Sequence, residues 1–131
     1  MKKRHARVPR YRFFFYARNE EPDQYGEVDD TYTCIVSGFF SREKARRPLE
    51  IADASATINE IQYVLEGEYL KRYFDVVTVE MLAWCPQTDK VYEVIGEPID
   101  NMGNNRKTMI YVVDNVRRVI DTSTLSTEFT N

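Results

Sequence analysis

Residues 89–114, DKVYEVIGEPIDNMGNNRKTMIYVVD, contain the clearest pair of strands in the sequence. Lys90–Ile95 (KVYEVI) and Arg106–Val113 (RKTMIYVV) are rich in β-branched and aromatic residues, a composition that is typical of β-strands. Gly96–Asn105 separates them and contains two glycines, one proline and three asparagines, which favour turns. The stretch therefore predicts two strands joined by a polar connection, and it contains no recognisable catalytic motif.

Three further segments have the composition of strands. Arg10–Arg18 (RYRFFFYAR) is dense in aromatic residues, and Thr31–Phe40 (TYTCIVSGFF) mixes β-branched with aromatic residues. Asp75–Trp84 (DVVTVEMLAW) is the third segment, and the turn Pro86–Asp89 (PQTD) follows it. Several short strands separated by turn signals predict an all-β fold, either a small β-barrel or a β-sandwich.

The chain has 131 residues, a length that is typical of one domain. We expect a β-barrel domain at residues 10–114, with a basic N-terminal arm at residues 1–9 and a Thr/Ser-rich C-terminal arm at residues 115–131. Two long connections, residues 19–30 and 41–56, would project from the barrel. The C-terminal arm also holds scattered apolar residues, so it would be either a free arm or a strand lent to a neighbouring molecule.

The segment from residue 48 to residue 66 fits two structures. Apolar residues recur at helical spacing: Ile51, Ala54, Ile58, Ile61 and Leu65. Pro48 at the start and Gly67 at the end would suit one short helix. The last apolar residues also alternate, as they would in a strand: Ile61, Tyr63 and Leu65. Because the surrounding segments are β, we favour a strand over Thr57–Glu66, with a β-bulge near Asn59.

Positive charge is concentrated at the N-terminus. Residues 1–18 contain seven Lys or Arg and no acid, whereas the rest of the chain holds eleven Lys or Arg and all twenty-one Asp or Glu. The basic residues of interest are Lys2, Lys3, Arg4, Arg7, Arg10 and Arg12. Such an arm suits an anionic partner, either nucleic acid or an acidic protein surface. It would equally suit the acidic body of a neighbouring copy of the chain.

The sequence offers little catalytic or metal-binding chemistry. His5 is the only histidine, so neither a Ser-His-Asp triad nor a Cys-His pair is plausible, and the nitrogen and sulfur ligands are too few for a zinc site. The chain has no glycine-rich phosphate-binding loop. The acids of the first long connection fit a solvated loop better than a calcium loop: Glu20, Glu21, Asp23, Glu27, Asp29 and Asp30. We expect no enzymatic activity, no metal and no cofactor.

Cys34 and Cys85 both lie in apolar segments and lack CxxC spacing, so we expect two buried structural thiols. A disulfide would require the fold to bring them together. No apolar run approaches the ~20 residues that span a bilayer, and the basic N-terminus lacks the apolar core of a signal peptide. We therefore expect synthesis in the cytoplasm and no membrane partner.

The order of these segments resembles the head–tail joining proteins of tailed bacteriophages, which are also called head closure, adaptor or stopper proteins. The shared pattern is an acidic turn before an aromatic strand, a long polar excursion, a Gly-aromatic step and a final hairpin. The first strand of that hairpin reads K-x-Y-x-V-x-G-x-P. In this sequence the pattern occupies, in order, Asp23–Gly26, Tyr32, Ser41–Ala56, Gly67–Tyr69, Lys90–Pro98 and Arg106–Val112.

The resemblance implies a small β-barrel that forms a homo-oligomeric ring in the neck of the virus particle. The ring would join the portal of the DNA-filled head to the tail and help to retain DNA. Its partners would be other copies of itself, the portal or an adaptor protein above and the tail or a stopper protein below. It would also touch packaged DNA non-specifically. The protein would then be a structural virion component that is synthesised in the host cytoplasm.

Two polar segments would contact neighbouring subunits or line the lumen of such a ring. Their residues are Glu97, Asp100, Asn101, Asn104, Asn105, Arg42, Lys44, Arg46 and Arg47. The alternative function is a small β-barrel module that binds nucleic acid through its basic N-terminal arm, because the arm mixes arginine with aromatic residues. Binding of that kind should weaken steeply as the salt concentration rises.

Overall fold

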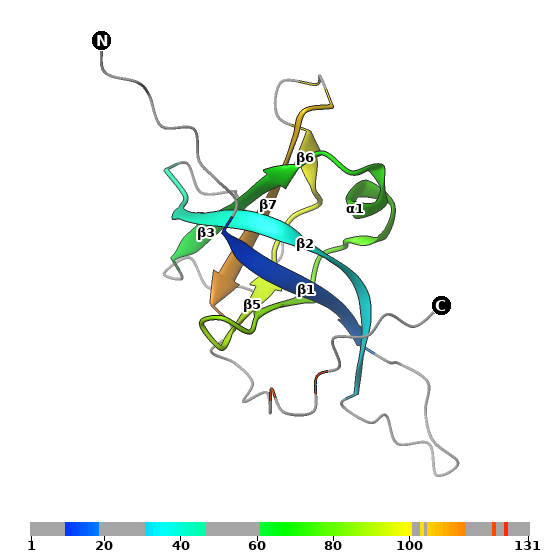
Figure 1. Ribbon diagram of the computed structural model, residues 1–131, viewed down its shortest axis with the longest axis vertical. Helices are drawn as coiled ribbons and strands as arrows, with labels where there is room; N and C mark the ends of the chain where they lie inside the picture. The colour runs from blue at the N-terminus through cyan, green and yellow to red at the C-terminus, as the bar shows by residue number, and fades with distance from the viewer. Residues whose placement is uncertain are drawn as a thin grey trace.

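The computed structural model describes residues 10–18, 31–46, 61–100 and 105–114, together with Gly103, Thr122 and Leu125. These residues form seven strands and one short helix (Figure 1). The elements are β1 (Tyr11–Arg18), β2 (Tyr32–Lys44), β3 (Gln62–Glu68), α1 (Lys71–Val76), β4 (Leu82–Cys85), β5 (Lys90–Val94), β6 (Ile99–Asp100) and β7 (Lys107–Asp114).

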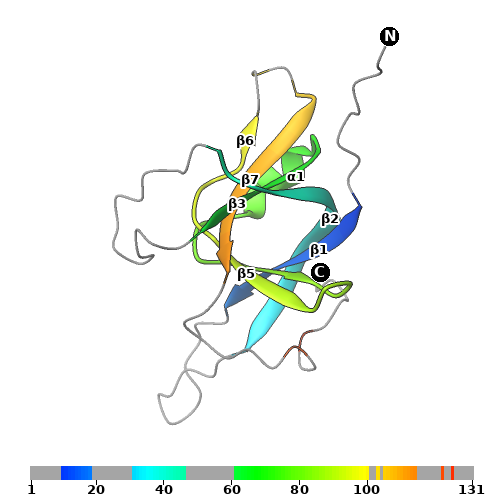
Figure 2. The ribbon, with the colours of Figure 1, turned by 90° about the vertical axis from the view of Figure 1, so that its left-hand side faces the viewer.

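The strands form one antiparallel sheet that closes on itself. The order around the closed sheet is β1, β2, β3, β7, β5 and β4, and β4 pairs with β1 again. β6 is an additional short strand that pairs with the first half of β7. Figure 2 shows the strands wrapped around a common interior. The prediction of an all-β fold is confirmed, and of the two architectures that we considered the molecule has the barrel.

β1 contains four consecutive buried aromatic residues because both of its faces are covered. Phe13 and Phe15 belong to the interior cluster, whereas Phe14 and Tyr16 belong to a second cluster on the outer face. Other members of the interior cluster are Val36, Phe40, Leu65, Tyr73, Val77, Met81, Ala83, Cys85, Tyr92, Val94, Ile110 and Val112. Large side chains thus fill the interior of the barrel in the described part of the chain.

A β-bulge in β2 sets which side chains face outward. Phe15 pairs with Val36, but the next residue, Tyr16, pairs with Cys34, so Ile35 is the extra residue of the bulge. Without the bulge, strict alternation would turn Cys34 into the barrel. With it, Cys34 joins Tyr16 on the outer face.

The outer cluster also includes a residue from the predicted C-terminal arm. Leu125 is buried against the barrel together with Phe14, Tyr16, Cys34 and Leu82. The rest of the arm, apart from Thr122, lies outside the described residues. Cys34 therefore lies in the outer cluster and Cys85 in the interior, and both are buried free thiols, as predicted.

The prediction of one strand over Asp75–Trp84 is wrong for its first half. Asp75 and Val76 complete α1, and β4 begins only at Leu82. Val77 and Met81, which looked like alternate residues of a strand, are both buried in the interior cluster. The amide of Val77 donates to the carbonyl of Tyr73 at 2.9 Å, which ends the helix. The chain then turns at Val79 and Glu80, and the φ of 76° at Glu80 is incompatible with a continuous strand.

β3 decides between a strand and a helix for residues 62–66, the last part of the segment that fits two structures. Gln62–Glu68 is a strand because it pairs with β2 on one side and β7 on the other, so a helix over residues 62–66 is wrong. The predicted short helix occurs instead at Lys71–Val76. Residues 47–60, which include the start of Thr57–Glu66 and the proposed bulge at Asn59, lie outside the described part.

β2 is longer than its sequence predicted. We expected the strand to end at Phe40 and a polar connection to begin at Ser41, but the strand continues to Lys44. The reason is tertiary, because Phe40–Lys44 pairs with Tyr63–Gly67 of β3. The first connection, residues 19–30, lies outside the described residues.

The final hairpin is confirmed in its strands and corrected in its connection. β5 and β7 match the predicted segments within one residue at each end. The connection between them is not wholly irregular, because Ile99–Asp100 pairs with Thr108–Met109 as β6. The backbone then reverses through Gly103 and Asn105, with φ of 66° and 57°, and the Asp100 carboxylate accepts the Asn105 amide at 3.1 Å.

Candidate docking pocket at the edge of β2

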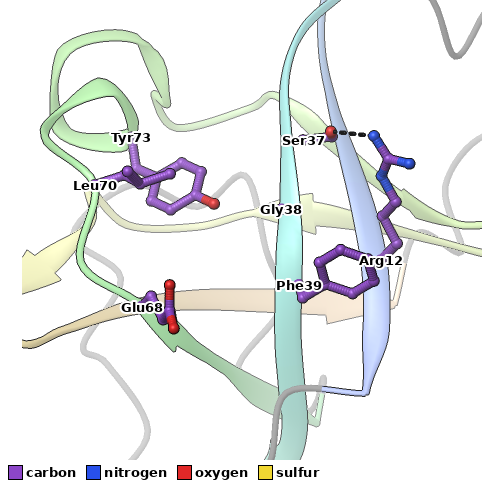
Figure 3. A pocket seen from close by; sticks show the side chains of 7 residues that line it. All are labelled: Arg12, Ser37, Gly38, Phe39, Glu68, Leu70 and Tyr73. Atoms are coloured by element: carbon purple, nitrogen blue, oxygen red, sulfur yellow. Dashed lines mark hydrogen bonds between the residues drawn. The ribbon is translucent and has the colours of Figure 1, made fainter.

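A pocket of about 400 Å³ lies between β2 and the segment that leads from β3 into α1. The residues that line it are Arg12, Ser37, Gly38, Phe39, Glu68, Leu70 and Tyr73. Figure 3 shows Glu68, Leu70 and Tyr73 facing β2 across the opening, with Arg12 on the other side of β2. The pocket therefore combines residues of three strands, the segment that follows β3 and a helix.

The pocket exists because β2 changes its partner along its length. Tyr32–Phe40 pairs with β1, whereas Phe40–Lys44 pairs with β3. β3 ends at Glu68 and the chain turns into α1, so no described strand runs along the second edge of Ser37–Phe39. This open strand edge forms one wall of the pocket and can accept further backbone hydrogen bonds.

Gly38 lets α1 approach β2 closely. The phenol of Tyr73 lies directly over Gly38, and a Cβ atom at this position would collide with the Tyr73 hydroxyl. Tyr73 is 3% exposed and packs against Phe40 at a ring-centroid distance of 5.2 Å. Burial, reinforced by the negative charge of Glu68, raises the pKa of Tyr73, so its phenol stays neutral at physiological pH.

Arg12 supplies a positive charge that no described carboxylate neutralises. Its guanidinium donates to the Ser37 hydroxyl at 3.2 Å. It also lies over two rings, 4.8 Å from the centroid of Phe14 and 5.8 Å from that of Phe39. These contacts fix the side chain on the outer face of β1, which leaves its charge available to an anionic group.

The rim of the pocket is apolar on both sides. Phe39 is 57% exposed and Leu70 is 49% exposed, the first and third largest values among the exposed apolar side chains of the described residues. Glu68 is exposed beside Leu70, and it makes no ion pair with any described residue. Two exposed apolar side chains with one charge of each sign nearby are typical of a protein contact surface.

The side chains and the strand edge of the pocket are suited to binding another chain. The pocket contains no histidine and no thiol, because Cys34 and Cys85 belong to the packed clusters. Its one buried titratable group, Tyr73, has a pKa raised by burial, which makes it a poor general base near neutral pH. An open strand edge with apolar and charged side chains beside it is instead the chemistry that recognises an extended peptide.

A second polar cluster lies near the other end of β2. Arg42 donates to the Tyr92 hydroxyl at 2.6 Å, and its guanidinium carbon lies 5.1 Å from the centroid of the Tyr63 ring. Burial raises the pKa of Tyr92, and the hydrogen bond from Arg42 partly opposes that effect. The phenol of Tyr92 is thus fixed inside the barrel wall by a cation at its rim.

The predicted contact residues of the first polar segment follow β2 in order. Arg42 and Lys44 occupy alternate positions of the strand and are exposed, and Arg46 is exposed just after it. Neither Lys44 nor Arg46 makes an ion pair with a described residue. Arg47 lies outside the described residues. These side chains were expected in a loop, and the structure places the first two on a strand instead.

The predicted contact residues of the second polar segment lie around β6. Glu97 and Asn105 are exposed, and Asp100 is half-buried because it accepts the Asn105 amide. Asn101 and Asn104 lie outside the described residues. No hydrogen bond or ion pair joins this group to the cations of β2 in the described part of the chain.

Of the six basic residues singled out at the N-terminus, the structure describes two. Arg10 is exposed at the start of β1, and Arg12 lines the pocket. The others lie outside the described residues: Lys2, Lys3, Arg4 and Arg7. Arg12 is thus the one predicted residue that belongs to the pocket, although it was predicted as part of a basic arm.

Only a weak signal for the remaining pocket residues is present in the sequence. Phe39 and Phe40 are adjacent in a strand, so alternation requires that one of them face outward, and Phe39 does. Nothing in the sequence indicated that Leu70 and Tyr73 would lie opposite it. Their positions depend on α1, and the sequence did not indicate a helix at Lys71–Val76.

Among the described residues, no group of three or more potential metal ligands comes together. No helix in that part of the chain is long and apolar enough to cross a membrane.

Comparisons with known proteins identify a fold but no family. No protein-family model matches the chain, and no curated protein matches it. One solved structure with a similar fold is the solution structure of protein SF1141 from Shigella flexneri 2a, a structural genomics target. It superimposes with a TM-score of 0.57 at 15% sequence identity and covers 83% of this chain and 95% of its own. At that identity the similarity shows a shared fold alone.

Proposed function

We propose that this protein is a structural component of the neck of a tailed bacteriophage. Copies of it would form a ring that joins the portal of the DNA-filled head to the tail and helps to hold the DNA. The proposal combines the sequence pattern, which resembles head–tail joining proteins, with a β-barrel architecture of the kind that this resemblance implies.

The open edge of β2 beside the pocket is the observation that carries this proposal. A closed barrel uses nearly all of its strand edges internally, so an edge flanked by exposed Phe39 and Leu70 is available for contact with another molecule. In a ring, each subunit needs two different surfaces, one to give a contact and one to receive it. The pocket supplies a surface of the receiving kind.

The basic side chains at the end of β2 and just after it fit the contact with packaged DNA that the neck function includes. Lys44 and Arg46 are exposed without an ion-pair partner among the described residues, and Arg42 is stacked on Tyr63. Side chains of this type bind phosphate groups independently of base sequence. In a neck ring they would touch packaged DNA non-specifically.

These basic side chains also support an alternative function, in which the barrel is a free nucleic-acid-binding module. A module of that kind should bind DNA in solution, with an affinity that falls steeply with salt. The double variant Lys44→Glu/Arg46→Glu should then lose binding. The matched control is Lys90→Glu/Arg106→Glu, which changes the net charge equally at two exposed sites away from β2.

The test of the neck function is electron microscopy of particles assembled with the gene disabled. Heads that have lost their DNA, together with unattached tails, are the expected result, and the intact gene supplied in trans should restore complete particles. Complete, infectious particles without the gene product would overturn the proposal. In that case salt-dependent DNA binding by the cations of β2 would become the favoured function.

A further inference from the structure

The edge of β2 in the pocket is unpaired over Ser37–Phe39. Among the described residues, β1 is the only strand whose register with β2 includes Ser37–Phe39, because the pairing of β2 with β3 begins at Phe40. Half of the backbone groups of a strand point to each side, so this segment presents donors and acceptors to the pocket. An added strand would satisfy them directly.

The two sides of that edge differ in chemistry. The outer side presents the unneutralised guanidinium of Arg12, held by Ser37. The side towards α1 presents exposed Leu70 and the phenol of Tyr73 (Figure 3). Consecutive side chains of an added strand point to opposite faces, so one would meet Arg12 and the next would meet Leu70. A carboxylate followed by an aromatic residue satisfies both sides.

The chain itself contains such a pair in a strand-forming context. Residues 126–130 read STEFT, in which Glu128 precedes Phe129, and threonine and phenylalanine favour strands. The preceding Leu125 is buried in the outer cluster against Phe14. Leu125, the residue that immediately precedes this segment, therefore lies on the outer face of the barrel.

We propose that residues 126–130 of a second copy of the chain add to the edge of β2 at Ser37–Phe39 as an extra strand. Glu128 would pair with Arg12, and Phe129 would pack against Leu70. Every copy has both the donor segment and the pocket, and these are different surfaces, so the contact is head-to-tail and can close a ring. This inference rests on the ring function proposed above and names the contact that would hold the ring.

Disulfide trapping between two full-length variants tests the contact directly. One variant has Leu70→Cys and the other has Phe129→Cys, while the native Cys34 and Cys85 are buried. After mixing and oxidation, we expect the mixed dimer to predominate over both homodimers on non-reducing electrophoresis. Val79→Cys is the matched control for Leu70→Cys, because Val79 is 43% exposed and does not line the pocket.

Each other result of the trapping experiment overturns the proposal. No mixed dimer, or an equal yield with Val79→Cys, would show that the segment does not enter the pocket. The single chain that contains both Leu70→Cys and Phe129→Cys distinguishes the source of the segment. If it forms only an internal disulfide while the mixture of single variants forms none, the pocket takes the segment of its own chain.

Titration with a synthetic peptide of residues 124–131 tests the chemistry of the contact. We expect the peptide to shift the amide signals of Ser37–Phe39 in the full-length protein, and Glu128→Gln in the peptide to weaken binding by roughly tenfold. In the Arg12→Gln protein the two peptides should bind equally. Equal binding of both peptides to the native protein would overturn the pairing of Glu128 with Arg12.

These experiments separate the inference from the function on which it rests. If trapping and titration fail but particles without the gene product lack a neck, the neck function stands and this contact is wrong. If they succeed but those particles are complete, the chain assembles through β2 in some other structure.

Discussion

At Gly38 the absence of a side chain decides how closely α1 can pack on β2. The Tyr73 phenol occupies the space that a Cβ atom would need, and Phe40 and Phe15 hold the ring in place. Gly67 is a similar case in β3, but there a Cβ atom would lie 2.6 Å from the backbone carbonyl oxygen of Phe39. The two glycines thus differ in whether a side chain or the backbone stands in the way.

Gly38→Ala should destabilise the protein by about 1–3 kcal/mol, because the added methyl group would collide with the Tyr73 phenol, whose ring packs against Phe15 and Phe40. The change Tyr73→Phe removes the colliding hydroxyl, so the loss from Gly38→Ala should be smaller in that background. Urea unfolding of the two single variants and the double variant measures the difference. Strictly additive losses would show that the collision does not occur.

Val94 and Ile110 are fully buried in the interior cluster, as their places in the predicted strands required. Val94→Asp or Ile110→Asp would bury a carboxylate without a partner, at a cost of several kcal/mol. Because a domain of this size is stable by about 5–15 kcal/mol, either change should leave it largely unfolded. Circular dichroism and chemical unfolding measure this. The control is Val79→Asp at a 43% exposed site, which should fold normally.

At the scale of elements, one side chain in the turn between β4 and β5 continues the hydrogen bonding of the sheet. β4 pairs with β1 only at Phe14–Tyr16. Beyond that point, the amide of Gln87 takes the place of a strand. Its carbonyl oxygen accepts the backbone amide of Arg12 at 2.7 Å, and its amino group donates to the carbonyl of Arg10 at 3.2 Å. The start of β1 is therefore held on both sides.

Gln87→Ala should destabilise the protein by about 1–2 kcal/mol, since two hydrogen bonds are lost at an exposed site. Gln87→Glu should restore less than half of that loss, because a carboxylate can accept from Arg12 but cannot donate to Arg10. Hydrogen exchange of the Arg12 amide reports the effect locally, and Thr88→Ala in the same turn serves as the control. Unchanged exchange in Gln87→Ala would rule out the bridging role.

For the molecule as a whole, burial of phenols sets a limit on stability at alkaline pH. Burial raises the pKa of Tyr16, Tyr73 and Tyr92 above the ordinary tyrosine value, and it also raises that of the Cys34 thiol. In the unfolded chain these groups lose their protons at their ordinary values, whereas the folded chain retains them. The unfolded state then binds fewer protons, so stability decreases as pH rises.

The free energy of unfolding should therefore be nearly constant from about pH 7 to about pH 8 and should decrease above about pH 10. Urea unfolding at several pH values measures the slope, and Tyr16→Phe should make the alkaline decrease shallower. A free energy of unfolding that does not change up to about pH 11 would contradict the burial of these groups.

Much of the fold could be predicted from the sequence because the signals are local. Turn residues separate β-branched and aromatic runs, and these determine β1, β5, β7 and the turn after β4. The burial of Cys34 and Cys85 also follows from their apolar neighbours. Each of these features depends on composition within about ten residues of chain, which is the range over which turn and strand preferences act.

The tertiary structure alone decided the features that form the pocket. β2 extends to Lys44 because β3 pairs with it, and Val77 and Met81 turn inward because the interior accepts them. Phe39 comes opposite Leu70 only because β3 leaves β2 after Gly67. The sequence by itself determined a β protein with outward aromatic residues. The closure of the sheet, which joins segments far apart in the chain, decided where the open edge of β2 would lie.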